Sequence, residues 1–122
     1  MVFDEILRLT PRGTVIPKPR PRGKYIIKGL GKRRGETALI YTIPNHKNPQ
    51  KPYEKGVTDS ELEQSYARLT ASGTLTRQWF VKTLPECNAE GSCNFTTIGG
   101  LFVLLGKAAY EGAGTYRRVD CA

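Results

Sequence analysis

The sequence predicts a small α+β domain built from three helices, a C-terminal β-hairpin and an additional N-terminal β-hairpin. Apolar residues recur at helical spacing within residues 58–73 and 94–106. Runs rich in β-branched and aromatic residues flank glycine-containing turns within residues 24–43 and 107–119. The 122 residues are enough for one hydrophobic core but not for two, so we predict a single domain over residues 1–122.

The N-terminal part predicts a short helix, an extended arm and a hairpin. Apolar residues at rough helical spacing predict a helix over residues 2–10, which Pro11 ends. Four prolines and two glycines within residues 11–23 predict an extended arm or linker, called the arm below. Residues 24–43 predict a hairpin, and its tip, residues 31–35, is expected to be exposed and basic.

The next segments predict a loop and then two closely spaced helices. Residues 44–56, with three prolines and two asparagines, predict a loop. Thr58 and Glu61 have the spacing of a capping box, in which a hydroxyl and a carboxylate satisfy the first backbone groups of a helix. We expect Gly73 to end this helix, and Thr74 or Thr76 to cap the following one.

A third helix is strongly apolar and contains two adjacent glycines. We expect Pro85 to end the second helix, residues 86–93 to form a polar loop, and Asn94 to cap the third helix. Gly99 and Gly100 would each cost about 1 kcal/mol relative to alanine in a helix interior. Close approach of another helix or of a ligand backbone would offset this cost, as would a helix that starts after the two glycines.

The chain ends in a second predicted hairpin. Residues 107–119 contain two short strand-like runs around a glycine-rich turn. Tyr110 and Tyr116 fall at positions where they can form an aromatic cross-strand pair.

The excess of positive over negative charge is confined to the first half of the chain. Residues 1–60 contain 13 Lys and Arg against 5 Asp and Glu, whereas residues 61–122 contain 6 of each, so the net charge of +8 belongs to the first half. Such a bias favours phosphate backbones, because binding releases condensed counterions. A membrane surface would call for a basic amphipathic helix, which the prolines of the arm exclude. Charge that serves only solubility remains the alternative.

Three helices followed by a hairpin, over residues 58–119, resemble a winged helix-turn-helix DNA-binding domain. In that family the third helix enters the major groove and the wing contacts the DNA backbone or the minor groove. Two features depart from the pattern: the connection before the third helix is long, and this helix has no basic residue before Lys107. The resemblance implies three groups of DNA-contacting residues: Asn94, Thr96 and Thr97 at the start of the third helix, Arg117 and Arg118 on the wing, and Arg77 and Lys82 on the second helix.

The charge and the resemblance together predict a nucleic-acid-binding protein, with double-stranded DNA favoured. A small transcriptional regulator or a mobile-element accessory protein would fit. We expect backbone affinity to come from the cations of the arm and of the first hairpin: Arg20, Arg22, Lys24, Lys32, Arg33 and Arg34.

Other functions remain open from the sequence. A metal-free ribonuclease or toxin could use His46 as a general base, and a protein-interaction module would need no nucleic acid. No catalytic motif is recognisable, and we expect neither a cofactor nor a metal, since Cys87, Cys93 and Cys121 lack zinc-site spacing. The absence of a signal peptide and of a long apolar run predicts a cytoplasmic protein without a membrane partner, and a homodimer remains an option.

Overall fold

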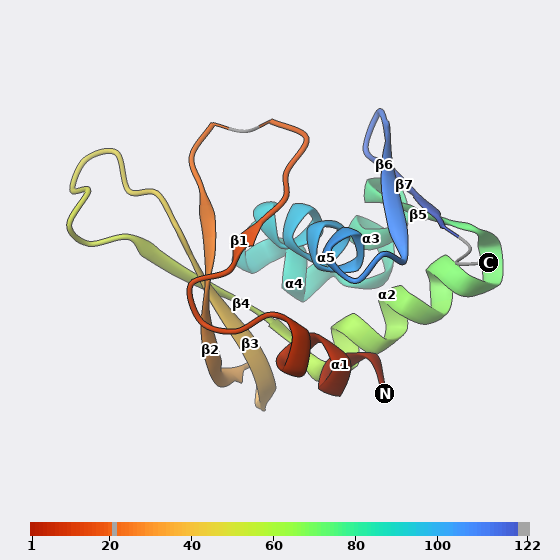
Figure 1. The fold of residues 1–122 in the computed structure, drawn as a ribbon, viewed down its shortest axis with the longest axis horizontal. Coiled ribbons are helices and arrows are strands. Elements are labelled where there is room, and N and C mark those ends of the chain that lie inside the picture. Colours follow the sequence, from red (N-terminus) through yellow and green to blue (C-terminus); the bar gives the residue numbers. More distant parts are fainter. Residues whose placement is uncertain (21, 120–122) are drawn as a thin grey trace.

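A computed structural model describes residues 1–20 and 22–119 of the chain. This part folds into five helices and seven strands, which confirms the α+β class and adds one helix, Pro85–Glu90, to the four that the sequence indicated. The strands form two antiparallel sheets. Figure 1 shows the sheets on opposite sides of the molecule, with a group of helices between them. None of the helices in these residues is long and apolar enough to cross a membrane.

The N-terminal half forms a helix and a four-stranded sheet of order β1–β2–β3–β4. Its elements are α1 (Val2–Leu9), β1 (Val15–Ile16), β2 (Tyr25–Arg33), β3 (Glu36–Ile43) and β4 (Tyr53–Thr58). The predicted hairpin is confirmed as β2–β3, but its turn consists of only Arg34 and Gly35, both left-handed with φ of 51° and 76°. Three strands fall where none was predicted: β1 within the arm, β4 at the end of the predicted loop and, in the C-terminal half, β5 (Thr74–Thr76).

The C-terminal half forms four helices and a three-stranded sheet of order β5–β7–β6. Its elements are α2 (Asp59–Ser72), β5 (Thr74–Thr76), α3 (Arg77–Thr83), α4 (Pro85–Glu90), α5 (Cys93–Leu104), β6 (Ala108–Gly112) and β7 (Thr115–Arg118). The predicted C-terminal hairpin is β6–β7, and its Tyr110 and Tyr116 pair across the strands.

The helix ends follow the sequence in α2 and α3 and differ in α4 and α5. The capping box of Thr58 and Glu61 is complete, and Gly73 is left-handed at the end of α2. Pro85 begins α4 rather than only ending α3, as its fixed φ and missing N–H permit at the first turn of a helix. Asn94 lies inside α5 instead of capping it, because the helix begins at Cys93, two residues earlier than predicted.

Helix α5 lies in the middle of a core that draws residues from every part of the chain, from α1 to β7. The two glycines of α5 allow neighbouring segments to pack closely against this helix. A Cβ added at Gly99 would lie well under 3.0 Å from the ring of Tyr116 on β7. One added at Gly100 would collide with the backbone oxygen of Pro17 in the arm. Close approach therefore accounts for both glycines, with a side chain on one side and a backbone on the other.

The turn between β2 and β3 is tied to the helical half by Arg34. Its guanidinium donates to both carboxylate oxygens of Glu61 at 2.7 Å, to Glu90 at 2.5 Å and to the Gly56 carbonyl at 2.9 Å. Arg33 donates to the same Glu90 at 3.0 Å. The side chain of Arg34 is only 15% exposed, so the tip does not present three exposed cations as the sequence led us to expect; Lys32 alone is exposed.

Replacing Gly99 by alanine is expected to destabilise the protein. In an unconstrained helix this change stabilises by about 1 kcal/mol. Here the new methyl group meets the buried ring of Tyr116, and overpacking of this kind costs about 1–3 kcal/mol. Urea denaturation measures the change. Combining Gly99→Ala with Tyr116→Leu should cost less than the sum of the single changes. A stabilised Gly99→Ala protein would contradict the close approach.

Replacing Arg34 by alanine is expected to lower the free energy of unfolding by about 3 kcal/mol, because the buried carboxylate of Glu61 loses its partner. Lys28→Ala is the control, since Lys28 pairs with Glu54 where both side chains are over 40% exposed, at 43% and 44%. That loss should stay within about 1 kcal/mol. Equal losses in the two variants would show that the Arg34 contacts add nothing beyond a surface pair.

The same contacts predict how stability depends on pH. Burial alone would raise the pKa of Glu61, but hydrogen bonds from Arg34 and from the Thr58 backbone outweigh it and leave the pKa below its usual value. A lowered folded pKa stabilises the protein above the unfolded pKa, about 4.3, and this contribution is lost as pH falls through the folded pKa. We therefore expect the stability difference between the native chain and Arg34→Ala to shrink below about pH 4.

Candidate nucleic-acid interface

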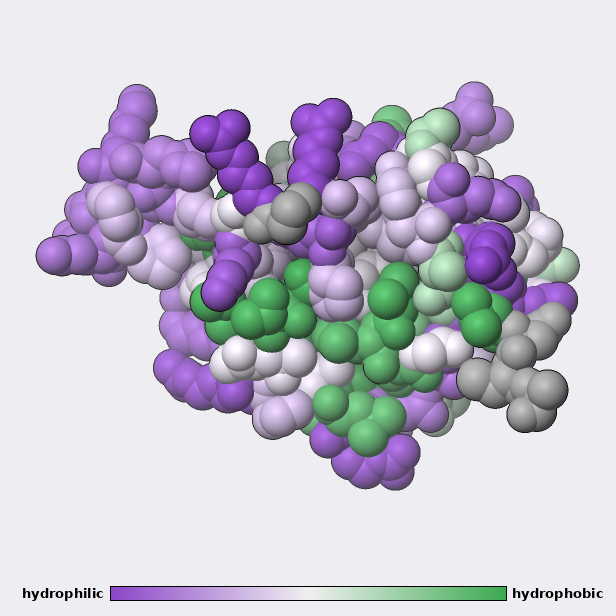
Figure 2. Space-filling view, turned by 45° about the horizontal axis from the view of Figure 1, so that its top comes forward, coloured by the Kyte–Doolittle hydropathy of each residue, from purple (hydrophilic) through white to green (hydrophobic). Residues whose placement is uncertain are grey.

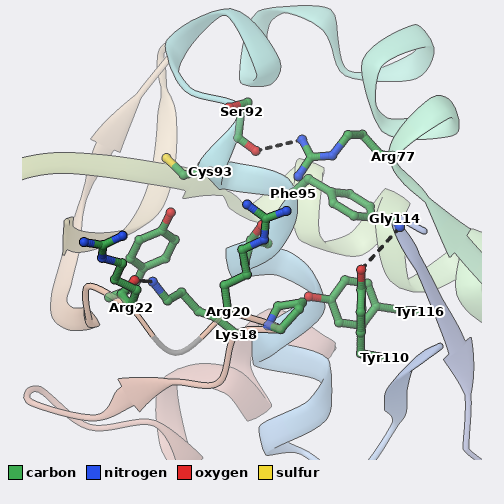
Figure 3. Close-up of a pocket in the computed structure, with 13 residues that line it drawn as sticks. Lys18, Arg20, Arg22, Arg77, Ser92, Cys93, Phe95, Tyr110, Gly114 and Tyr116 are labelled. Atoms are coloured by element: carbon green, nitrogen blue, oxygen red, sulfur yellow. Dashed lines mark hydrogen bonds between the residues drawn. The ribbon is translucent and has the colours of Figure 1, made fainter. Parts of the chain in front are cut away.

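A basic cavity of about 530 Å³ opens where the arm, the start of α5 and the β6–β7 hairpin meet (Figure 3). Within residues 1–20 and 22–119, thirteen residues line it, and none of these is acidic. The lining includes four cations: Lys18, Arg20, Arg22 and Arg77. Positive charge gathered in such a hollow attracts anions more strongly than the same charge spread over a flat surface.

The arm forms one wall of the basic cavity and is fixed at both ends. Its buried Ile16 belongs to β1 and pairs with Tyr25 of β2, while Gly100 lets the Pro17 backbone lie directly on α5. The ammonium group of Lys18 donates to the carbonyls of Arg22 and Gly23 and lies 4.2 Å above the ring of Tyr25. Lys18 therefore closes the arm into a loop. Because its ammonium group already donates to these carbonyls, it has fewer N–H groups left for a ligand.

Three arginines supply the charge that remains for a ligand. Arg20 and Arg22 are exposed, and within residues 1–20 and 22–119 neither forms an ion pair. Arg77 lies at the first position of α3, donates to the Ser92 carbonyl at 3.1 Å and covers the Phe95 ring at 4.8 Å. Figure 3 shows the guanidinium groups of Arg20 and Arg77 directed into the same space. Figure 2 shows strongly hydrophilic side chains over the part of the surface where the arm lies.

Tyrosines of the hairpin form the opposite wall. Tyr110 is 43% exposed, and its ring meets that of Tyr116 edge-on with centroids 5.2 Å apart. The Gly114 backbone N–H donates to the Tyr110 hydroxyl at 3.4 Å. Burial raises the pKa of Tyr116 to about 12, so this phenol stays neutral and adds no negative charge near pH 7.

Cys93 lies at the edge of the basic cavity in a defined hydrogen-bond chain. The Tyr41 hydroxyl is 2.5 Å from the side-chain oxygen of Asn94 and 3.2 Å from the sulfur of Cys93. The Asn94 amide group donates to the Cys87 carbonyl, which fixes its oxygen toward Tyr41. The Tyr41 hydroxyl therefore bridges the side-chain oxygen of Asn94 and the sulfur of Cys93.

The structure brings four of the predicted site residues to the basic cavity and places the others elsewhere. Arg20, Arg22, Arg77 and Thr96 line it. Lys24, Lys32, Lys82 and Arg117 are exposed but do not line it. Arg33 and Arg34 are held in the ion pairs with Glu90 and Glu61, and Arg118 donates to the Thr70 carbonyl.

The start of α5 does not present the residues expected of a recognition helix. Asn94 and Thr97 are fully buried, with no exposed area. The N-terminal sheet is the cause, because Tyr41 of β3 hydrogen-bonds Asn94 and the arm packs along the same helix. Only Thr96, which is half-buried, reaches a surface that a ligand can enter.

Sequence reasoning missed Tyr25 and gave Tyr110 only a structural role. Both become cavity residues because the arm folds back over α5, and the sequence carries no direct sign of this contact beyond Gly100. His46 is exposed in the loop between β3 and β4 and does not line the basic cavity. Among the described residues no cluster of His, Cys, Asp or Glu could hold a metal ion; Cys121 lies outside them. No known protein family, curated protein or solved structure matches this chain.

The rate at which the Cys93 thiol reacts with charged and neutral reagents tests the charge of the basic cavity. In a Cys121→Ser variant, Cys93 should be the thiol that reacts in the folded state, because Cys87 is fully buried. The dianionic disulfide reagent dithionitrobenzoate should react about tenfold faster at low than at high ionic strength, whereas neutral dithiodipyridine should show little change. Arg20→Ala and Arg22→Ala should slow only the anionic reagent. Equal effects on both reagents would contradict the cationic lining.

Proposed function

We propose that this protein binds nucleic acid through the basic cavity and the arm beside it. The observation that carries the proposal is the convergence of Lys18, Arg20 and Arg22 from the arm with Arg77 from α3, around a hollow whose described lining residues include no acid. Phosphodiester groups are the anions that such clustered cations bind through counterion release. The exposed ring of Tyr110 in the same lining suits bases better than it suits inorganic anions.

The element order supports a winged-helix-like unit over residues 58–119. Helices α2, α3 and α5 occur in the expected order and are followed by the β6–β7 hairpin, which corresponds to the wing. The return strand of this hairpin also pairs with β5, so the wing is anchored between α2 and α3. In this proposal the short helix α4 fills the long connection that departs from the family pattern.

The proposed mode of binding differs from that of the family. Because Asn94 and Thr97 are buried, reading bases with the start of α5 would require the N-terminal sheet to move away. We instead assign affinity to the arm and to Arg77, which contact phosphates without reading a sequence. Binding to duplex DNA is then salt-dependent and has low sequence specificity. An accessory protein of a mobile element or a small regulator could use such binding.

The salt dependence of duplex binding tests this proposal. Affinity for random-sequence duplex DNA should fall linearly in a log–log plot against salt. The double variant Arg20→Ala with Arg22→Ala should reduce the slope by about 0.9 for each phosphate group that the protein no longer neutralises. Lys28→Ala with Lys51→Ala removes the same charge away from the basic cavity and should change the slope little.

Two results would refute the proposal. One is the absence of binding to any nucleic acid at about 50 mM salt, where electrostatic binding is strong. The other is an equal reduction of the slope in both double variants, because net charge alone would then account for the binding.

A further inference from the structure

We infer that the basic cavity receives an unpaired nucleotide, so that the preferred ligand is single-stranded nucleic acid or a duplex with an unpaired end. This inference rests on the proposed function and names its substrate class. It follows from the combination of phosphate-binding cations with one available aromatic face inside a single hollow. The volume of about 530 Å³ lies within the range of about 300–1,000 Å³ in which proteins enclose small organic ligands.

Of the aromatic rings that line the basic cavity, Tyr110 offers the best stacking surface. The ammonium of Lys18 covers Tyr25, and the guanidinium of Arg77 covers Phe95. Tyr116 is buried and meets Tyr110 with its ring at 66°. Tyr110 is the most exposed of these rings, and the hydrogen bond from Gly114 holds its hydroxyl end in place.

A ring face can be used only by a base that has left its duplex stack. Paired bases expose their edges in the grooves and hide their faces against their neighbours. Proteins that bind single strands combine a cationic groove for the backbone with aromatic side chains that stack on bases. The basic cavity has this combination, with Arg20 and Arg77 directed at one space and Tyr110 on the far wall (Figure 3).

The lining also predicts how far bases are distinguished. Among the described residues the lining contains no Asn, Gln, Asp or Glu, which recognise adenine or cytosine edges, and its arginines, which can pair with guanine edges, are the groups that we assign to phosphates. Near the start of α5, the neutral hydroxyls of Ser92 and Thr96 are the side-chain groups that can still hydrogen-bond a base edge. We therefore expect binding that depends on an unpaired base but discriminates weakly among the four bases.

Fluorescence anisotropy on the full chain tests the inference with four matched probes. These are an oligothymidylate and an oligouridylate of about ten nucleotides, a blunt duplex, and the same duplex with a single-stranded overhang. The overhang duplex should bind roughly tenfold more tightly than the blunt one. Tyr110→Ala should remove this difference, while Tyr110→Phe should retain it. Tyr53→Ala, at an exposed tyrosine on β4 outside the basic cavity, is the control.

Each outcome has a defined meaning. A blunt duplex that binds as tightly as the overhang duplex, with no effect of Tyr110→Ala, overturns this inference and leaves the proposed function standing. Absence of binding to all four probes at low salt overturns both. Competition by thymidine monophosphate as strong as that of the oligothymidylate would also overturn it, because the ligand would then be a free nucleotide. The ratio of thymidylate to uridylate affinity decides which strand, DNA or RNA, is preferred.

Discussion

The fold depends on the ion-paired guanidinium of Arg34, which joins the N-terminal sheet to the helical half. Arg34 occupies a left-handed position in a two-residue turn, from which its side chain reaches Glu61 and Glu90 on two different helices. Glu61 also accepts from the Thr58 backbone, so one carboxylate starts α2 and anchors the hairpin. The pKa of Arg34 is raised, mainly by its hydrogen bonds to Glu61, which favour the charged guanidinium.

The basic cavity depends on this anchor together with the two glycines of α5. Arg34 fixes β2, β2 pairs with β1, and β1 leads the arm onto α5 at Gly100. On the other side of α5, Gly99 leaves room for the Tyr116 ring. It thereby determines how closely the hairpin that carries Tyr110 packs against α5. The same packing buries Asn94 and Thr97, so forming the cavity and presenting α5 as a recognition helix exclude each other in this conformation.

Local signals predicted much of the fold, and long-range contacts account for what they missed. The capping box at Thr58 and the β2–β3 hairpin act over a few residues and are visible in sequence. Strand β4 was missed because it begins with exposed polar residues beside prolines, and its partner β3 alone makes it a strand. For the site, charge density in the sequence identified the arm. Arg33 and Arg34 looked as accessible as the cations of the arm, because their carboxylate partners lie at least 27 residues away in sequence.

We propose that ligands meet this protein at the basic cavity rather than at the hairpin tip or along α3. Mapping of backbone NMR shifts during titration with a short oligothymidylate distinguishes these surfaces. We expect shifts to cluster at residues 18–25, at residues 92–96 and around Tyr110, with Lys32 and Lys82 unaffected. Shifts centred on Lys32 or Lys82, with residues 18–25 unchanged, would contradict it.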